Sequence, residues 1–73
     1  MKYKVYILLA EGYEEAEAVT PWDILKRAGA EVLLVSVNGN KYVTGAHGLA
    51  TGTDLKLDGI AYDFDMLFLP GGK

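Results

Sequence analysis

Three acidic side chains follow the first apolar run of the chain, and their spacing could place one carboxyl group beside a buried site. Glu14, Glu15 and Glu17 open a segment of helical composition, residues 14–28. On a helical period, Glu17 shares a stripe with apolar residues and should mark the N-terminal end of the face that packs on a sheet. The other members of this stripe are Pro21, Ile24, Leu25 and Ala28. Partial burial and like-charged neighbours would favour a protonated, hydrogen-bond-donating Glu17, whereas the helix dipole would favour the ionised form.

A simpler interpretation of the three glutamates stays open. All three carboxylates could merely complement the positive end of the helix dipole. Glu14 and Glu15 are predicted to form a solvated face, and Glu17 is the candidate for chemistry.

Two glycines form a second candidate site. Gly71 and Gly72 follow Pro70 after a buried apolar run. Without side chains, successive glycines can turn backbone N–H groups toward a bound oxyanion. The same dipeptide is a strong turn signal, so an ordinary turn is the alternative.

His47 is the single histidine, and the chain has no cysteine. A metal site therefore has little support, and we expect a loop or interface histidine and no metal.

Three apolar runs must position these residues. Residues 5–10, 31–37 and 65–69 are continuous rather than alternating, which is typical of parallel strands buried on both faces. A helix over residues 14–28 lies between the first two, so the chain begins as a βαβ unit. Residues 42–63 contain four glycines and no long helical period, and are predicted to form short strands and turns.

The predicted helix has clear end signals and one discordant residue. Lys26 and Arg27 near its end suit the helix dipole, and Gly29 suits the left-handed position after the last turn. Pro21 follows Thr20, which could cap a new helical start, so we expect a kink or re-initiation there.

Length and composition limit the function classes. The 73 residues form at most one domain, and one helix cannot cover both faces of a parallel sheet, so the chain is expected to be part of a larger domain. A net charge of −3 with scattered basic residues provides no surface for nucleic acid. No run is long enough for a membrane span, so a cytoplasmic location is expected. The turn after residues 5–10 lacks G-x-G-x-x-G, which argues against nucleotide binding.

Three segments carry a resemblance to a known family. They are residues 10–17 (AEGYEEAE), residues 21–29 (PWDILKRAG), and residues 62–72, where Tyr62-Asp63 leads into LFLPGG. In these motifs and in their order, residues 1–73 resemble the N-terminal part of the ThiJ/DJ-1/PfpI family.

The resemblance implies a flavodoxin-like three-layer α/β sandwich with a parallel sheet, usually a homodimer, and a reactive cysteine on a nucleophile elbow. It implies that Glu17 is protonated and hydrogen-bonds the cysteine thiolate, and that Gly71 and Gly72 present backbone amides to an oxyanion. No metal or organic cofactor is implied. Four positions would lie at or near the usual dimer surface: Ala16, Val19, Arg27 and His47.

The cysteine itself would fall beyond Lys73. The chain is then expected to hold the acid and the oxyanion donors, and a complementary C-terminal segment of the same domain must supply the nucleophile. The implied activity is conversion of small reactive carbonyls, of the glyoxalase or protein-deglycase type, or related hydrolysis. The alternative is a non-catalytic stress-response protein, a redox sensor or chaperone with a reversibly oxidised cysteine.

Overall fold

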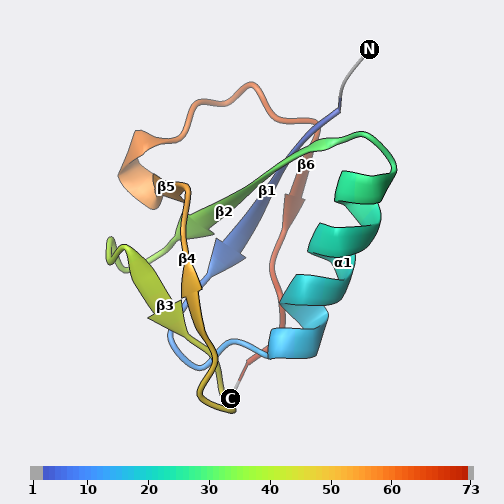
Figure 1. Ribbon diagram of the computed structural model, residues 1–73. Coiled ribbons are helices and arrows are strands. Elements are labelled where there is room, and N and C mark those ends of the chain that lie inside the picture. Colours follow the sequence, from blue (N-terminus) through green and yellow to red (C-terminus); the bar gives the residue numbers. More distant parts are fainter. Residues whose placement is uncertain (1–2, 73) are drawn as a thin grey trace.

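A central apolar strand organises the fold. The structure is a computed structural model that describes residues 3–72. In this range a βαβ unit is followed by a short hairpin and a return to the sheet (Figure 1). The elements are β1 (Lys4–Leu9), α1 (Glu15–Arg27), β2 (Glu31–Ser36), β3 (Tyr42–Thr44), β4 (Ala50–Gly52), β5 (Leu55–Lys56), a 3-10 turn (Leu57–Gly59) and β6 (Met66–Phe68).

The main sheet is parallel throughout. Its four strands lie in the order β5-β2-β1-β6, and Ile7 of β1 aligns with Leu34 on one side and Phe68 on the other. β3 and β4 form a separate antiparallel pair. The predicted α/β fold with a parallel sheet is confirmed, and the segment predicted as short strands and turns supplies both the hairpin and the edge strand β5.

Burial differs between the central and edge strands. Ile7 and Leu9 of β1 are fully buried on the side of α1, and Tyr6 is buried on the opposite face, where its ring lies 5.5 Å from that of Phe64. β6 is at the sheet edge, and its Met66 and Leu67 are 47% and 40% exposed. Burial on both faces is therefore found for β1, whereas β6 at the sheet edge is partly exposed in this chain.

The helix ends as its sequence predicts. Gly29 has a φ of +93°, and the N–H groups of Gly29 and Ala30 donate to the carbonyls of Lys26 and Leu25, which is the Schellman arrangement. The expected re-initiation at Thr20 is not found: α1 is continuous and contains Pro21. Within residues 3–72, no helix is long and apolar enough to cross a membrane.

An aspartate holds the segment before β6 against β1. Asp63 accepts hydrogen bonds from Lys4 Nζ at 2.8 Å and from the Tyr6 hydroxyl at 3.1 Å. Asp65 adds two bonds to the backbone of Lys4, accepting through Oδ2 and donating through N–H, both at 2.8 Å. These bonds fix where β6 enters the sheet.

Replacing Tyr6 by phenylalanine is expected to lower the free energy of unfolding by about 1 kcal/mol, because the buried ring stays and one hydrogen bond is lost. Tyr3→Phe is the matched control, since Tyr3 is 63% exposed and its hydroxyl has no partner among residues 3–72. Urea denaturation measures both. Equal effects of the two substitutions would contradict this role of the Tyr6 hydroxyl.

The Asp63 contacts should make stability depend on acid pH. The hydrogen bond from Lys4 is the main cause that holds the pKa of Asp63 below its ordinary value of 3.8. The stability that Asp63 contributes is therefore present above that value and lost as the pH falls through the lower, folded-state pKa.

The free energies of unfolding of the wild type and of Asp63→Asn, measured by denaturation, should differ at about pH 5 and converge toward about pH 2. Asp58→Asn is the control, because Asp58 lies in the exposed 3-10 turn and its side chain makes no hydrogen bond among residues 3–72. A difference for Asp63→Asn that stays constant across this range would exclude the proposed linkage.

Candidate active site

A carboxyl group on the first turn of α1 contacts the segment that follows β6. Glu17 Oε1 accepts a hydrogen bond of 2.9 Å from Gly71 N–H, across 54 positions of sequence. Glu14 N–H donates to the Gly71 carbonyl at 2.7 Å, and Tyr13 and Gly72 form an antiparallel bridge. The structure thus brings Glu17 and the glycine pair together at the edge where β1 and β6 end. Their catalytic role stays a prediction.

The predicted helix stripe is wrong by one position. Glu17 is exposed in this chain and Ile24 is 59% exposed, whereas Ala18 is buried and Trp22 and Leu25 are half-buried against the core. Trp22 has the largest apolar surface on the helix, and its burial turns α1 so that Glu17 lies beside the buried face rather than on it. Glu17 therefore contacts the glycine pair from the exposed side of α1 and not from the buried interface between α1 and the sheet.

The two glycines have different surroundings. Neither has a positive φ, so neither is needed for a left-handed turn. A Cβ on Gly71 would lie 2.6 Å from Glu17 Oε1, and one on Gly72 would lie 3.1 Å from the Gly12 carbonyl oxygen. The close approach of these neighbouring atoms therefore explains why glycine suits both positions. Gly71 N–H is engaged by Glu17, while within residues 3–72 Gly72 N–H donates to no acceptor, which leaves it as the candidate oxyanion donor.

A groove of about 380 Å³ lies at this edge of the sheet. The glycine pair, Tyr13 and Glu11 line it, and Glu11 is the single charged residue in that lining among residues 3–72. Glu11 Oε2 accepts a hydrogen bond of 2.7 Å from Thr44 N–H, which fixes the carboxylate. Ligands of open α/β folds bind beyond the carboxyl ends of the strands, which is where this groove lies. Glu17 is not in its lining and contacts its rim through Gly71.

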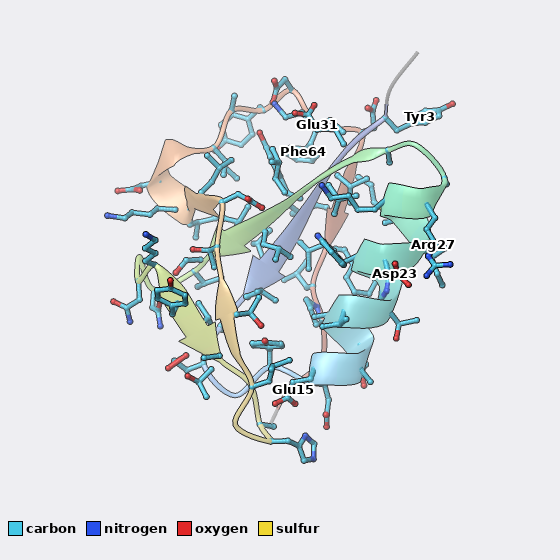
Figure 2. All side chains as sticks on the ribbon, viewed as in Figure 1. Tyr3, Glu15, Asp23, Arg27, Glu31 and Phe64 are labelled. Carbon is cyan, nitrogen blue, oxygen red and sulfur yellow. The ribbon has the colours of Figure 1, made fainter. Side chains whose placement is uncertain are left out.

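Glu15 joins the helix to the β3–β4 hairpin, which corrects its predicted place on a solvated face. Figure 2 shows Glu15 at the N-terminal end of α1, and its side chain is 14% exposed. Its Oε2 accepts hydrogen bonds from the N–H groups of His47 at 2.8 Å and Leu49 at 3.2 Å. Burial raises the pKa of Glu15, but hydrogen bonds from the His47 side chain and from backbone N–H groups outweigh it and lower the pKa from 4.5 to about 2.

His47 lies in the loop between β3 and β4, as predicted, and its side chain is 73% exposed. Its Nδ1 is 2.9 Å from Glu15 Oε1 and 3.5 Å from Glu14 Oε1. The hydrogen bond to Glu15 and the charges of Glu15 and Glu14 raise the pKa of His47 above its ordinary value of 6.5.

The sequence interpretation missed Tyr13, Glu11 and Glu15 as structural supports of the site. Tyr13 is 3% exposed, and its hydroxyl hydrogen-bonds Thr51 Oγ1 and the Leu49 carbonyl. Each of the three residues contacts the hairpin more than 30 positions away. The acidic composition of residues 11–17 was the one available signal, and composition does not identify distant partners.

Comparison with known proteins identifies the family. Residues 3–73 match the family described as DJ-1/PfpI. The chain belongs to the DJ-1/PfpI family. It is 42% identical over 71 residues to Deglycase TK1284 of Thermococcus kodakarensis, and the match covers 96% of this chain and 42% of the relative. It is 35% identical to Protein/nucleic acid deglycase 2 of Escherichia coli, covering 99% of this chain and 43% of the relative.

Solved DJ-1/PfpI structures share the fold. Drosophila melanogaster DJ-1beta has a TM-score of 0.92 and 36% identity, with 99% of this chain and 39% of that chain covered. A cysteine-to-alanine mutant of the DJ-1 superfamily protein STM1931 from Salmonella typhimurium has a TM-score of 0.91 and 38% identity, with the same two coverages. This DJ-1/PfpI chain thus spans about 42% of the length of the deglycase from Thermococcus kodakarensis.

Proposed function

We propose that residues 1–73 are the N-terminal part of a single-domain, cysteine-dependent enzyme that acts on small reactive carbonyls. The contact between Glu17 Oε1 and Gly71 N–H supports the proposal, because the acid lies beside the glycine pair at the edge of the sheet where ligands of open α/β folds generally bind. Family relatives named deglycases support the same reaction class.

Each group has a role in this proposal. A cysteine thiolate from the complementary segment attacks the carbonyl carbon, so that an S–C bond forms and the π electron pair moves to oxygen. Gly72 N–H donates to that oxygen, and Gly71 N–H holds the Glu17 carboxyl in place. The protonated Glu17 carboxyl donates a hydrogen bond to the sulfur and so stabilises its thiolate form. It then gives the same proton to the new alkoxide and becomes a carboxylate.

Two partners complete the proposed protein. The complementary C-terminal segment would cover the apolar edge at β6, where Met66 and Leu67 and the following Leu69 are exposed. A second copy would pack on the surface that contains Ala16, Val19, Arg27 and His47, all of which are exposed in this chain. Light scattering on the complete protein gives the mass that tests the homodimer.

The proposed activity is tested by methylglyoxal consumption. The complete protein should consume methylglyoxal, and replacing the cysteine of the nucleophile elbow by alanine should abolish turnover. Absence of turnover by the wild type, together with peroxide-dependent formation of a sulfinate on that cysteine, would reject the enzyme in favour of a redox sensor.

A further inference from the structure

The N-terminal end of α1 and the loop between β3 and β4 bring together three side chains with metal-ligating atoms. Glu14, Glu15 and His47 each present one such atom, and these atoms lie within 4.8 Å of one another. The sequence analysis expected no metal because His47 has no second histidine or cysteine to accompany it, and Glu15, which the structure brings to His47, is 32 positions away in the sequence. We propose that these residues form a binding site for a divalent transition-metal ion of the Zn²⁺ type, separate from the Glu17 site.

The spacing of the ligand atoms suits zinc. Nδ1 of His47 is 2.9 Å from Glu15 Oε1 and 3.5 Å from Glu14 Oε1. Bonds of about 2.0–2.2 Å in a tetrahedral site separate neighbouring ligand atoms by about 3.3–3.6 Å, so side-chain movements of this size bring all three atoms to one ion. Three protein ligands leave the fourth position for water or for a group on another molecule.

The surroundings hold two of the ligands in place. Oε2 of Glu15 accepts hydrogen bonds from the backbone N–H groups of His47 and Leu49, and Oε1 faces the imidazole. Hydrogen bonds that fix a ligating carboxylate in this way strengthen metal sites. The same bonds fix the His47 backbone, so binding orders few additional atoms.

Charge and ligand type select the ion. Two carboxylates provide two negative charges, against about half a positive charge at the helix N-terminus. The imidazole favours zinc, nickel or copper over the hard cations calcium and magnesium, which prefer oxygen. The His47 side chain is 73% exposed in this chain. Because His47 also lies on the surface proposed for the homodimer, the second copy would lie beside the bound ion.

Isothermal titration of the chelator-treated complete protein with ZnCl₂ tests the site. We expect one Zn²⁺ per chain, unaffected by millimolar Mg²⁺, and at least tenfold weaker binding in His47→Gln and in Glu14→Gln. Both variants keep the Glu15 carboxylate and its backbone bonds, so the hairpin should stay docked. Glu31→Gln is the control, because it removes one negative charge at an exposed position on β2, away from the cluster.

X-ray absorption at the zinc edge gives an independent measurement. The expected spectrum has nitrogen and oxygen ligands including one imidazole, which His47→Gln removes. Sulfur ligation, unchanged affinity in both variants, or the absence of binding at micromolar concentrations would each overturn the proposal. Methylglyoxal turnover does not enter this test, so the metal site and the proposed function can fail separately.

Discussion

Replacing Glu17 by glutamine is expected to lower kcat/KM for methylglyoxal by about 10²–10⁴-fold in the complete protein. Glutamine keeps a side-chain oxygen that can accept the Gly71 N–H bond, so the local geometry should persist. What disappears is the exchangeable carboxyl proton and with it the proton transfer to the alkoxide, whereas the glutamine NH₂ group can still donate a hydrogen bond to the thiolate. Steady-state kinetics at several methylglyoxal concentrations measures the loss.

Glu31→Gln is the matched control for this substitution. It removes the same charge from an exposed position at the start of β2, at the opposite end of the sheet, and should leave kcat/KM unchanged. Circular dichroism and thermal unfolding establish that both variants are folded. A Glu17→Gln protein that stays within twofold of the wild type would mean that Glu17 has no part in the chemistry.

Replacing Gly71 by alanine is expected to lower kcat/KM by about 10²-fold, because it displaces the carboxyl group that we propose as the catalytic acid. The new Cβ would lie 2.6 Å from Glu17 Oε1, so the carboxyl must move and its bond to Gly71 N–H is strained or lost. Gly71 has no positive φ, and its nearest contacts are the end of a flexible side chain. The fold should therefore tolerate the methyl group while the site does not.

Gly59→Ala is the control for the added methyl group, because nothing lies within 4 Å of its Cβ position. The double variant Glu17→Gln/Gly71→Ala gives a sharper test. If Gly71 acts by holding Glu17, the double variant should be barely less active than Glu17→Gln alone. Fully multiplicative losses would show that the two residues act independently.

The sequence was sufficient for the main elements of the fold. The apolar runs that contain β1 and β2 are continuous and rich in β-branched or large aliphatic residues, and the structure has parallel strands there. Gly29 marked the end of α1 because only a residue that tolerates a positive φ suits the Schellman arrangement. These signals are local, so a single sequence contains them.

The position of Glu17 was only half predictable. Its proximity to the glycine pair follows from the rule that the N-terminus of a crossover helix and the carboxyl ends of parallel strands lie at one edge. The exposure of Glu17 does not follow from this rule, because the apolar residues of α1 fit two overlapping helical stripes, one that contains Glu17 and one that contains Ala18. The bulk of Trp22 decides which stripe packs, and this depends on the shape of the sheet surface.

The hairpin contacts could not be predicted. Glu11, Tyr13 and Glu15 each depend on how the β3–β4 hairpin returns over the end of β1, and no local pattern fixes that return. For the same reason the cluster of Glu14, Glu15 and His47 is visible only in three dimensions.

A crystal structure of the complete protein in its reduced state tests the central claim most directly. We expect a cysteine Sγ within about 3.5 Å of a Glu17 carboxyl oxygen, with Gly71 N–H still bonded to that side chain. A Glu17 carboxyl that contacts only water, with every thiol far from the glycine pair, would contradict the assignment.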